Sequence, residues 1–238
     1  MQVSELSIKI YADGAELGGI IDMAKNPLIK GFTTNPTLMR KAGITDYKKF
    51  AHEVIAAVPD RPISFEVFSD DLEEMYTQAM EIASWGNNIN IKVPVTNTQN
   101  QFAGGLIRKL SAQGIFVNVT ALMTIDQVNK VMDCLQGNAP AYISVFAGRI
   151  ADTGRDPMPV MTEAANISRT RPGTEIIWAS PRELLNVFQA NEAGVQIITV
   201  ANDILNKLSL VGKDLEDYSL DTVKMFRNDA VKAGFSIA

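Results

Sequence analysis

The chain alternates between short apolar segments and longer segments in which apolar residues recur at helical spacing. A short apolar or alternating run is typical of a strand, and apolar residues three and four apart are typical of a helix buried on one face. Eight strand segments can be counted, and the middle four begin 26 residues apart, at positions 63, 89, 115 and 141. The predicted strands are Ile8–Asp13, Gly31–Asn35, Ile63–Phe68, Ile89–Val93, Ile115–Thr120, Ala141–Phe146, Glu175–Ala179 and Val195–Val200.

A helical segment follows each predicted strand. The predicted helices span roughly 16–25, 46–58, 70–85, 99–113, 125–136, 159–169, 182–193 and 202–211. Two of them open with recognisable start signals. Thr124 and Gln127 are spaced as in a capping box. Ser180 and Glu183 have the same spacing, with Pro181 at the first helical position.

Eight strand–helix units in 238 residues predict an α/β fold, a (β/α)₈ TIM barrel. No linker rich in proline, glycine or serine interrupts the chain, so we expect residues 1–238 to form one catalytic domain. Leu215–Ala238 lies beyond the eighth unit and carries apolar residues at helical spacing, which predicts an additional C-terminal helix. The alternative is an open doubly wound sheet, although the glycine-rich phosphate loop that such sheets often carry is absent.

Composition narrows the possible partners. Charged residues make up 21% of the chain and the net charge is −5. A surface with this charge repels the phosphate backbone, so we expect no nucleic-acid partner. Small anionic substrates remain possible, because a local cluster of arginines can bind phosphate.

Metal and membrane functions are not indicated by the sequence. His52 is the one histidine and Cys134 the one cysteine. Zinc sites usually need three or four His, Cys or carboxylate ligands, so the histidine-rich zinc site of metal-dependent aldolases cannot be built. We expect no metal and no other cofactor. We find neither a secretory signal pattern nor an apolar run long enough for a membrane span, and we expect a cytoplasmic location.

Polar residues gather at the ends of six predicted strands. Residues two apart in a strand face the same way, and barrel enzymes keep their active sites at the carboxyl ends of the strands. Burying so many polar groups without partners would be costly, so we expect them to line a site. They are Asp13, Thr33, Asn35, Ser64, Glu66, Asn90, Lys92, Asn118, Thr120 and Ser144, with Phe146 on the same face as Ser144.

Lys92 is the most informative of these residues, because it lies inside a strand pattern rather than on a helix surface. Buried lysines are rare unless they are paired or functional. A desolvated amine can act as a nucleophile and form a Schiff base with a ketone. The alternative is a purely structural ion pair with Glu66 or Asp13.

Asp13 and Glu66 form a candidate acid–base pair, since carboxylates can move the protons that Schiff-base chemistry requires. The alternative for Asp13, in Ala-Asp-Gly, is a turn residue. Arg149, Ser180 and Arg182 follow strands six and seven, where barrels often bind phosphate. The alternative for Ser180 is simple helix capping.

At these residues the sequence resembles the transaldolase and fructose-6-phosphate aldolase family. Gly31–Met39 is similar to the family's first signature, and Ile91–Thr96 is similar to the motif of its Schiff-base lysine. The similarity continues through Asn118–Thr120, Ser144–Phe146, Arg149 and Ala179–Arg182, and so covers nearly the whole chain.

The resemblance implies a role for each site residue. Lys92 resembles the nucleophile, Asp13 the general acid/base, and Glu66 and Thr120 the pair that holds the catalytic water. Other positions resemble the family's substrate-binding residues. Among these, Asn35, Asn118 and Ser144 resemble the groups that bind the dihydroxyacetone hydroxyls, whereas Arg149, Ser180 and Arg182 resemble the phosphate binders.

The resemblance also implies a reaction, the transfer of a dihydroxyacetone unit between sugar phosphates in pentose phosphate metabolism. The aldolase branch typically has glutamine at the position of Glu66 and tyrosine at that of Phe146, so both residues favour transaldolase. The alternatives are an aldolase that releases free dihydroxyacetone and a non-catalytic sugar-phosphate-binding barrel. Short members of the family form rings, so we expect a homo-oligomer in which Leu215–Ala238 either reaches a neighbour or covers its own barrel.

Overall fold

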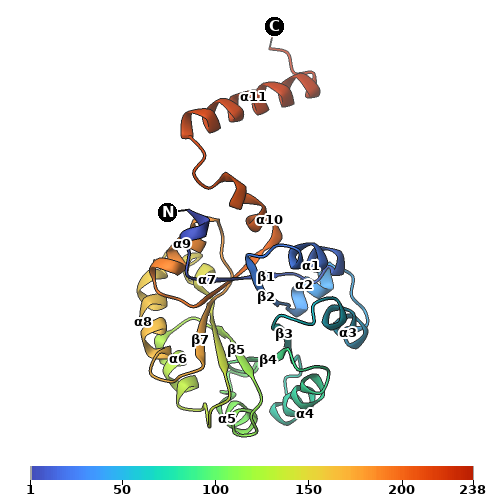
Figure 1. Ribbon diagram of the computed structural model, residues 1–238, viewed down its shortest axis with the longest axis vertical. Helices are drawn as coiled ribbons and strands as arrows, with labels where there is room; N and C mark the ends of the chain where they lie inside the picture. The colour runs from blue at the N-terminus through green and yellow to red at the C-terminus, as the bar shows by residue number, and fades with distance from the viewer. Residues whose placement is uncertain (1, 238) are drawn as a thin grey trace.

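A computed structural model describes residues 2–237. Eight parallel strands close into a barrel in sequence order, which confirms the predicted TIM barrel and excludes the open sheet (Figure 1). The strands are β1 Lys9–Asp13, β2 Ile29–Thr33, β3 Ile63–Glu66, β4 Ile89–Pro94, β5 Val117–Leu122, β6 Ala141–Val145, β7 Thr174–Trp178 and β8 Ile197–Ala201. All eight predicted strands are present, with bounds shifted by at most two residues.

Helices follow the strands along the chain, and all of them except α11 bury apolar residues. They are α1 Leu17–Ala24, α2 Pro36–Lys41, α3 Tyr47–Ala57, α4 Leu72–Ala83, α5 Gly104–Ala112, α6 Ile125–Met132, α7 Ala147–Ala151, α8 Met158–Ser168, α9 Leu185–Glu192, α10 Asn202–Leu205 and α11 Leu215–Ala233, with 3₁₀ turns η1 Val3–Glu5 and η2 Asn206–Leu210. The capping box of Thr124 and Gln127 is confirmed at the start of α6. Two short helices, α2 and α7, were not predicted. They begin just after β2 and β6, where the prediction had extended each strand to Asn35 and Phe146.

Aromatic side chains fill the amino-terminal half of the barrel interior, away from the carboxyl ends of the strands. Tyr11 and Tyr142 share a hydrogen bond of 2.7 Å between their hydroxyls, and Phe116 packs edge-on against Tyr142. Tyr11 fits because its neighbour on β2 is Gly31, where a Cβ atom would lie 2.5 Å from the ring. At the amino-terminal ends of the strands, Lys9 donates to both oxygens of Glu175. Because the amino-terminal half is packed with side chains, a site can form only at the carboxyl ends of the strands.

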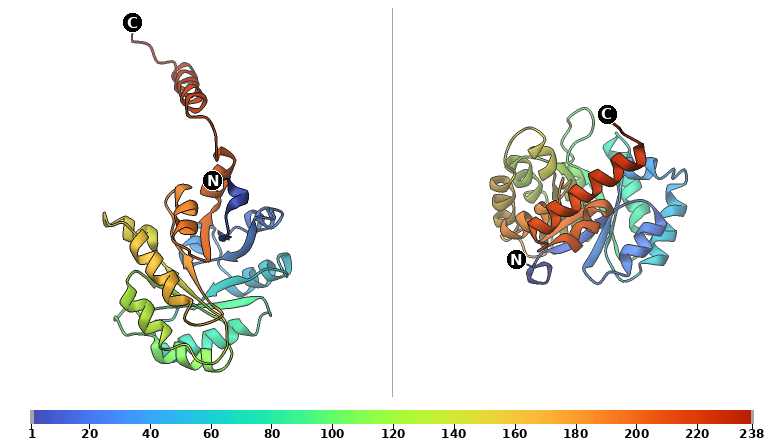
Figure 2. Two further views of the ribbon diagram at one scale, coloured as in Figure 1. Left: turned by 60° about the vertical axis from the view of Figure 1, so that its left-hand side comes forward. Right: turned by 90° about the horizontal axis from the view of Figure 1, so that it is seen from above.

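The helix α11 stands away from the barrel, as Figures 1 and 2 show. None of its residues is buried, and Leu220, Val223 and Phe226 are each at least half exposed. It ends at Ala233 and is capped by Gly234, which takes the left-handed conformation. The predicted additional helix is therefore present, and the expectation that it could cover its own barrel is wrong. No helix among residues 2–237 is both long and apolar enough to cross a bilayer.

Candidate active site

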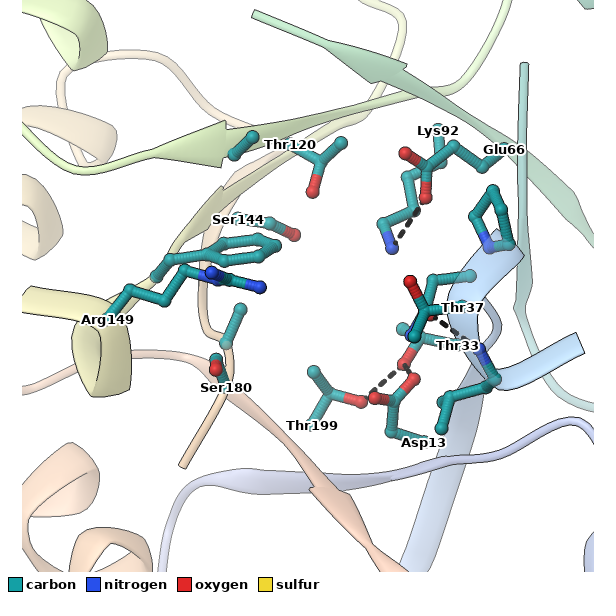
Figure 3. Close-up of a pocket in the computed structure, with 16 residues that line it drawn as sticks. Asp13, Thr33, Thr37, Glu66, Lys92, Thr120, Ser144, Arg149, Ser180 and Thr199 are labelled. Carbon is teal, nitrogen blue, oxygen red and sulfur yellow. Dashed lines mark hydrogen bonds and ion pairs between the residues drawn. The ribbon is translucent and has the colours of Figure 1, made fainter. Parts of the chain in front are cut away.

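A cavity of about 450 Å³ opens at the carboxyl ends of the strands (Figure 3). Ten of the fourteen residues that the sequence analysis singled out line it, together with Pro36, Thr37, Leu38, Ala121, Ala179 and Thr199, whereas Ser64, Asn90, Asn118 and Arg182 do not. The ten are Asp13, Thr33, Asn35, Glu66, Lys92, Thr120, Ser144, Phe146, Arg149 and Ser180. The closed barrel brings these residues together from strands far apart in the sequence.

Lys92 lies on β4 with only 6% of its surface exposed. Its Nζ atom lies 3.0 Å from Oε2 of Glu66 and donates to the carbonyl oxygen of Thr34 at 3.1 Å. The ion pair of the structural alternative is thus present, with Glu66 as the partner. It borders an open cavity rather than sealed core, so the pairing leaves the amine within reach of a ligand.

Asp13, at the end of β1, faces the same cavity. Thr33 donates its hydroxyl proton to Oδ1 of Asp13 at 2.7 Å, and the hydroxyls of Thr33 and Thr199 lie 2.5 Å apart. Since Thr33 has only one proton to give, Thr199 donates to Thr33. Burial raises the pKa of the Asp13 carboxyl above its ordinary value, the charge of Lys92 and the Thr33 hydrogen bond oppose this rise, and the charge of Glu66 adds to it. A carboxyl with a raised pKa is suited to exchange protons near neutral pH.

Thr120 and Ser144 occupy the next wall of the cavity (Figure 3). The Oγ1 atom of Thr120 is buried and has no hydrogen-bond partner among the described residues. An unsatisfied hydroxyl that faces a cavity can bind a ligand or a water molecule at low cost. Ser144 is held differently, because its hydroxyl donates to Oδ1 of Asn118 at 2.7 Å.

Asn118 lies beneath the cavity and does not line it. Its Nδ2 atom donates to the hydroxyl of Ser64 at 3.0 Å, and Ser64 in turn bonds closely to Asn90. Both polar ends of the Asn118 side chain are therefore used by protein groups. These bonds orient Ser144, which is the member of the network that faces the cavity.

The end of the cavity opposite Lys92 carries an arginine (Figure 3). The Arg149 guanidinium lies 5.9 Å from the centroid of the Phe146 ring, and Ser180 lies beside it (Figure 3). Arg182 does not line the cavity, because both oxygens of Asp152 hold its guanidinium in an exposed ion pair. The Asp152 contact raises the pKa of Arg182 and holds the pKa of Asp152 below its usual range.

The expected capping box at Ser180 is wrong. The helix α9 begins at Leu185, and the backbone N–H groups of Arg182 and Glu183 donate to Oδ1 of Asn186. Ser180 has a φ of 59°, in the left-handed region that non-glycine residues rarely adopt. Its carbonyl oxygen presses against Gly148, where a Cβ atom would lie only 1.6 Å away.

Three non-glycine residues between 2 and 237 have a positive φ, and two of them border the cavity. Ser180 is one and Ala121, with a φ of 68°, is the other. Ala121 sits in an irregular stretch of β5, between Val119 and Leu122. Strained backbone persists where surrounding structure enforces it, and it clusters at functional sites.

Comparison with known proteins identifies the family of the chain. The model of the family described as Transaldolase/Fructose-6-phosphate aldolase matches residues 10–237. The chain belongs to this family. A relative from Thermoanaerobacter, named "Probable transaldolase", is 36% identical over 234 residues, which cover 97% of this chain and all of the relative. One from Dehalococcoides mccartyi with the same name is 35% identical over 204 residues, covering 84% and 90% of the two chains.

Solved structures share the fold at much lower identity. A chain from Coccidioides immitis, assigned provisionally to the fructose-1,6-biphosphate aldolases, superposes with a TM-score of 0.58 at 14% identity and covers 85% of this chain and 76% of its own. A chain from Burkholderia cenocepacia, assigned in the same way to the phosphonomutases, gives 0.56 at 10% identity and covers 96% and 93%. At this identity the similarity concerns the barrel alone.

Family membership leaves the choice between transfer and aldol release open, since the family contains both enzymes. For this chain the geometry adds that Asn118 and Arg182 do not face the cavity, whereas Thr199 does. The sequence analysis missed Thr199, although a polar residue near the carboxyl end of β8 was the same signal that identified Thr33 and Thr120. In the part of the chain that the structure describes, no three His, Cys, Asp or Glu side chains converge into a group able to hold a metal ion.

Proposed function

We propose that the protein is a transaldolase that forms a Schiff base through Lys92. It would convert sedoheptulose 7-phosphate and glyceraldehyde 3-phosphate into erythrose 4-phosphate and fructose 6-phosphate. The observation that carries the proposal is the placement of one buried lysine amine beside a carboxylate, in a cavity whose far end holds Arg149 and Ser180. The names of the relatives support transfer over release.

The geometry supports different roles for Lys92 and Asp13 in the proposed transfer reaction. The Lys92 ammonium first gives a proton to the Glu66 carboxylate beside it, and the neutral amine then attacks the C2 carbonyl of the ketose phosphate. Loss of water from the carbinolamine gives a protonated imine. Asp13 takes the proton of the C4 hydroxyl while the C3–C4 bond breaks, and the electron pair of that bond moves to the imine, leaving an enamine. The aldose phosphate departs, and the enamine carbon bonds to the carbonyl carbon of an acceptor aldose phosphate while Asp13 returns its proton to the carbonyl oxygen. Hydrolysis of the new imine restores Lys92.

The remaining site residues would bind and orient the sugar. The oxygen of the Asn35 side chain caps α2, which leaves its amide nitrogen for a hydroxyl of the three-carbon unit. Ser144 would bind another, with Asn118 behind it. Glu66 and the unsatisfied hydroxyl of Thr120 would hold the water that leaves when the imine forms and that attacks when the imine is hydrolysed.

Borohydride reduction in the presence of fructose 6-phosphate tests the proposal. Mass spectrometry should find a three-carbon adduct on Lys92, and addition of erythrose 4-phosphate should yield sedoheptulose 7-phosphate. The absence of any adduct would favour the alternative of a non-catalytic barrel that binds sugar phosphates. An adduct together with rapid release of dihydroxyacetone and no transfer product would indicate the aldolase.

Arg149→Ala is expected to raise KM for phosphorylated substrates roughly ten- to a hundredfold, and KM for unphosphorylated analogues much less. A charged hydrogen bond is worth about 1.5–3 kcal/mol, which corresponds to this factor. Steady-state kinetics with fructose 6-phosphate and fructose measure the difference. Arg155→Ala is the control, because Arg155 is exposed and bonds only locally to Thr153. Equal losses on both kinds of substrate would make Arg149 structural.

Phe146→Tyr is expected to raise the rate of dihydroxyacetone release relative to the rate of transfer. The Phe146 ring lines the cavity and donates no hydrogen bond, so the enamine can wait for an acceptor. A hydroxyl at the tip of the ring could bind water and help protonate the enamine carbon, after which water releases the three-carbon unit. The measurement compares free dihydroxyacetone without acceptor and sedoheptulose 7-phosphate with erythrose 4-phosphate. An unchanged ratio would refute this role, and a parallel fall of both rates would mean that Phe146 only packs.

We also propose that the protein is a homo-oligomer, and that a ring is one arrangement it could take. The support is the exposed apolar surface of α11, since helices with such faces usually bury them against a partner. The solution mass from light scattering should exceed that of one chain, and Phe226→Asp should lower it.

A further inference from the structure

The pairing of β2 with β3 stops where the active site begins. The backbone N–H of Thr34 donates to the carbonyl of Ser64 at 3.2 Å. In a parallel ladder the next two bonds would join the N–H of Glu66 to the carbonyl of Thr34, and the N–H of residue 36 to the carbonyl of Glu66. Residue 36 is proline, which has no N–H, and the chain turns into α2 at this position. The ladder therefore cannot supply Glu66 with its second bond.

The side chain of Tyr47 supplies both missing bonds. Its hydroxyl donates to the carbonyl of Glu66 at 2.8 Å and accepts from the N–H of Glu66 at 2.9 Å. The ring is held by Phe65, Phe68 and Trp85, whose centroids lie 6.2, 5.5 and 5.9 Å away. Burial raises the pKa of the Tyr47 phenol, so the group stays a neutral hydroxyl that can donate and accept at once.

The carbonyl of Thr34, which the ladder would have given to Glu66, has a different partner. The Nζ atom of Lys92 donates to it at 3.1 Å. The same amine lies 3.0 Å from the Glu66 carboxylate. One interruption of the ladder thus fixes both the backbone of Glu66 and an acceptor for the nucleophilic amine.

We propose that Tyr47 is a positioning residue of the active site, whose hydroxyl takes the place of β2 at Glu66 and thereby leaves the Thr34 carbonyl to Lys92. The inference rests on the proposed function, because it assigns to Tyr47 a part in placing the Schiff-base lysine. Tyr47 does not line the catalytic cavity, so it acts through Glu66 and Lys92 and does not touch substrate.

Removal of the hydroxyl has a defined consequence. The partly buried N–H and carbonyl of Glu66 lose their partner, and unsatisfied backbone groups form hydrogen bonds elsewhere where they can. The nearest acceptor in the ladder for the Glu66 N–H is the carbonyl of Thr34. Competition for this carbonyl displaces the Lys92 amine and the Glu66 carboxylate relative to each other, while the phosphate end of the cavity, on the opposite wall, is unaffected.

The test is Tyr47→Phe, which keeps the ring and removes only the hydroxyl. We expect kcat for transfer to fall about tenfold, the loss expected for one misplaced hydrogen-bonded contact. The rate of adduct formation at Lys92, followed by borohydride quenching, should fall by the same factor. KM for fructose 6-phosphate should stay within about threefold of its original value, since the phosphate contacts are intact. The control is Tyr142→Phe, whose hydroxyl is also buried but bonds to Tyr11 instead.

The kinetic readouts separate positioning from structural support. If Tyr47→Phe lowers the melting temperature but leaves kcat and the adduct rate of the folded protein unchanged, the proposal is overturned. Equal kinetic losses in Tyr47→Phe and Tyr142→Phe would overturn it as well, since the effect would then be general. A wild-type protein that gives no adduct would overturn the proposed function, and this role of Tyr47 with it.

Discussion

Lys92→Ala is expected to abolish turnover and borohydride trapping while the chain keeps its barrel. Alanine offers no nucleophile, and the covalent path has no substitute for the missing amine. Lys92 lies 6% exposed on β4, beside Glu66. Removing one partner of a buried pair can destabilise a protein, but Glu66 borders the cavity, where water can solvate it. Circular dichroism and thermal unfolding check the fold, and intact mass after reduction checks the adduct.

Lys9→Ala is the matched control. Lys9 also projects from a barrel strand and pairs with a carboxylate, Glu175 at 2.6 Å, but at the opposite ends of the strands. This variant should lose some stability and keep both turnover and the adduct. Trapping at another lysine in the Lys92→Ala variant would refute the assignment of the nucleophile. Loss of activity in both variants would mean that the loss in Lys92→Ala reflects lower stability and not a missing nucleophile.

The parts of the structure that depend on local pattern could be predicted from the sequence. Each barrel strand is a short apolar run, and the polar residues at its end mark the mouth of the barrel. Lys92, Glu66 and Thr120 were found in this way, because a polar side chain inside an apolar run is costly unless it faces a site. Thr199 carried the same signal in Ile197–Ala201 and could have been found with it.

The parts that depend on contacts between distant segments could not be predicted. Ser180 has the spacing of a helix cap, but its backbone is forced into the left-handed region and its carbonyl packs on Gly148. The sequence predicted that Arg182 binds phosphate at the cavity, yet Asp152, 30 residues earlier, holds its guanidinium. Tyr47 looks like an ordinary aromatic residue at the start of a helix. Only the arrest of the β2–β3 ladder at Pro36 shows why its hydroxyl matters.

Asp13→Asn is expected to lower kcat by about 10² to 10⁴, the usual range for loss of a general acid or base. The amide can still accept the hydrogen bond of Thr33, so the local structure should persist. It cannot take the proton of the C4 hydroxyl when the C3–C4 bond breaks. Borohydride should still trap an adduct at Lys92, although more slowly, which separates proton transfer from nucleophilic attack. If Asp13 is only a turn residue, kcat should change no more than in Asp203→Asn, which removes an exposed charge at the same end of the barrel.

The same substitution makes a second, independent prediction about stability. Because burial raises the pKa of Asp13 in the folded state, the ionised carboxylate is less favourable there than in the unfolded chain. The folded protein keeps its full stability from this group below the unfolded-state pKa, and loses some of it as the pH rises through the folded-state pKa. Asparagine does not titrate, so the variant should unfold at a higher temperature than the wild type near neutral pH, and the difference should shrink towards about pH 4. A variant that is less stable at both pH values would mean that the Asp13 carboxylate stabilises the fold. A slower but more stable variant would mean that the barrel keeps a destabilising carboxyl at this position because the reaction requires it.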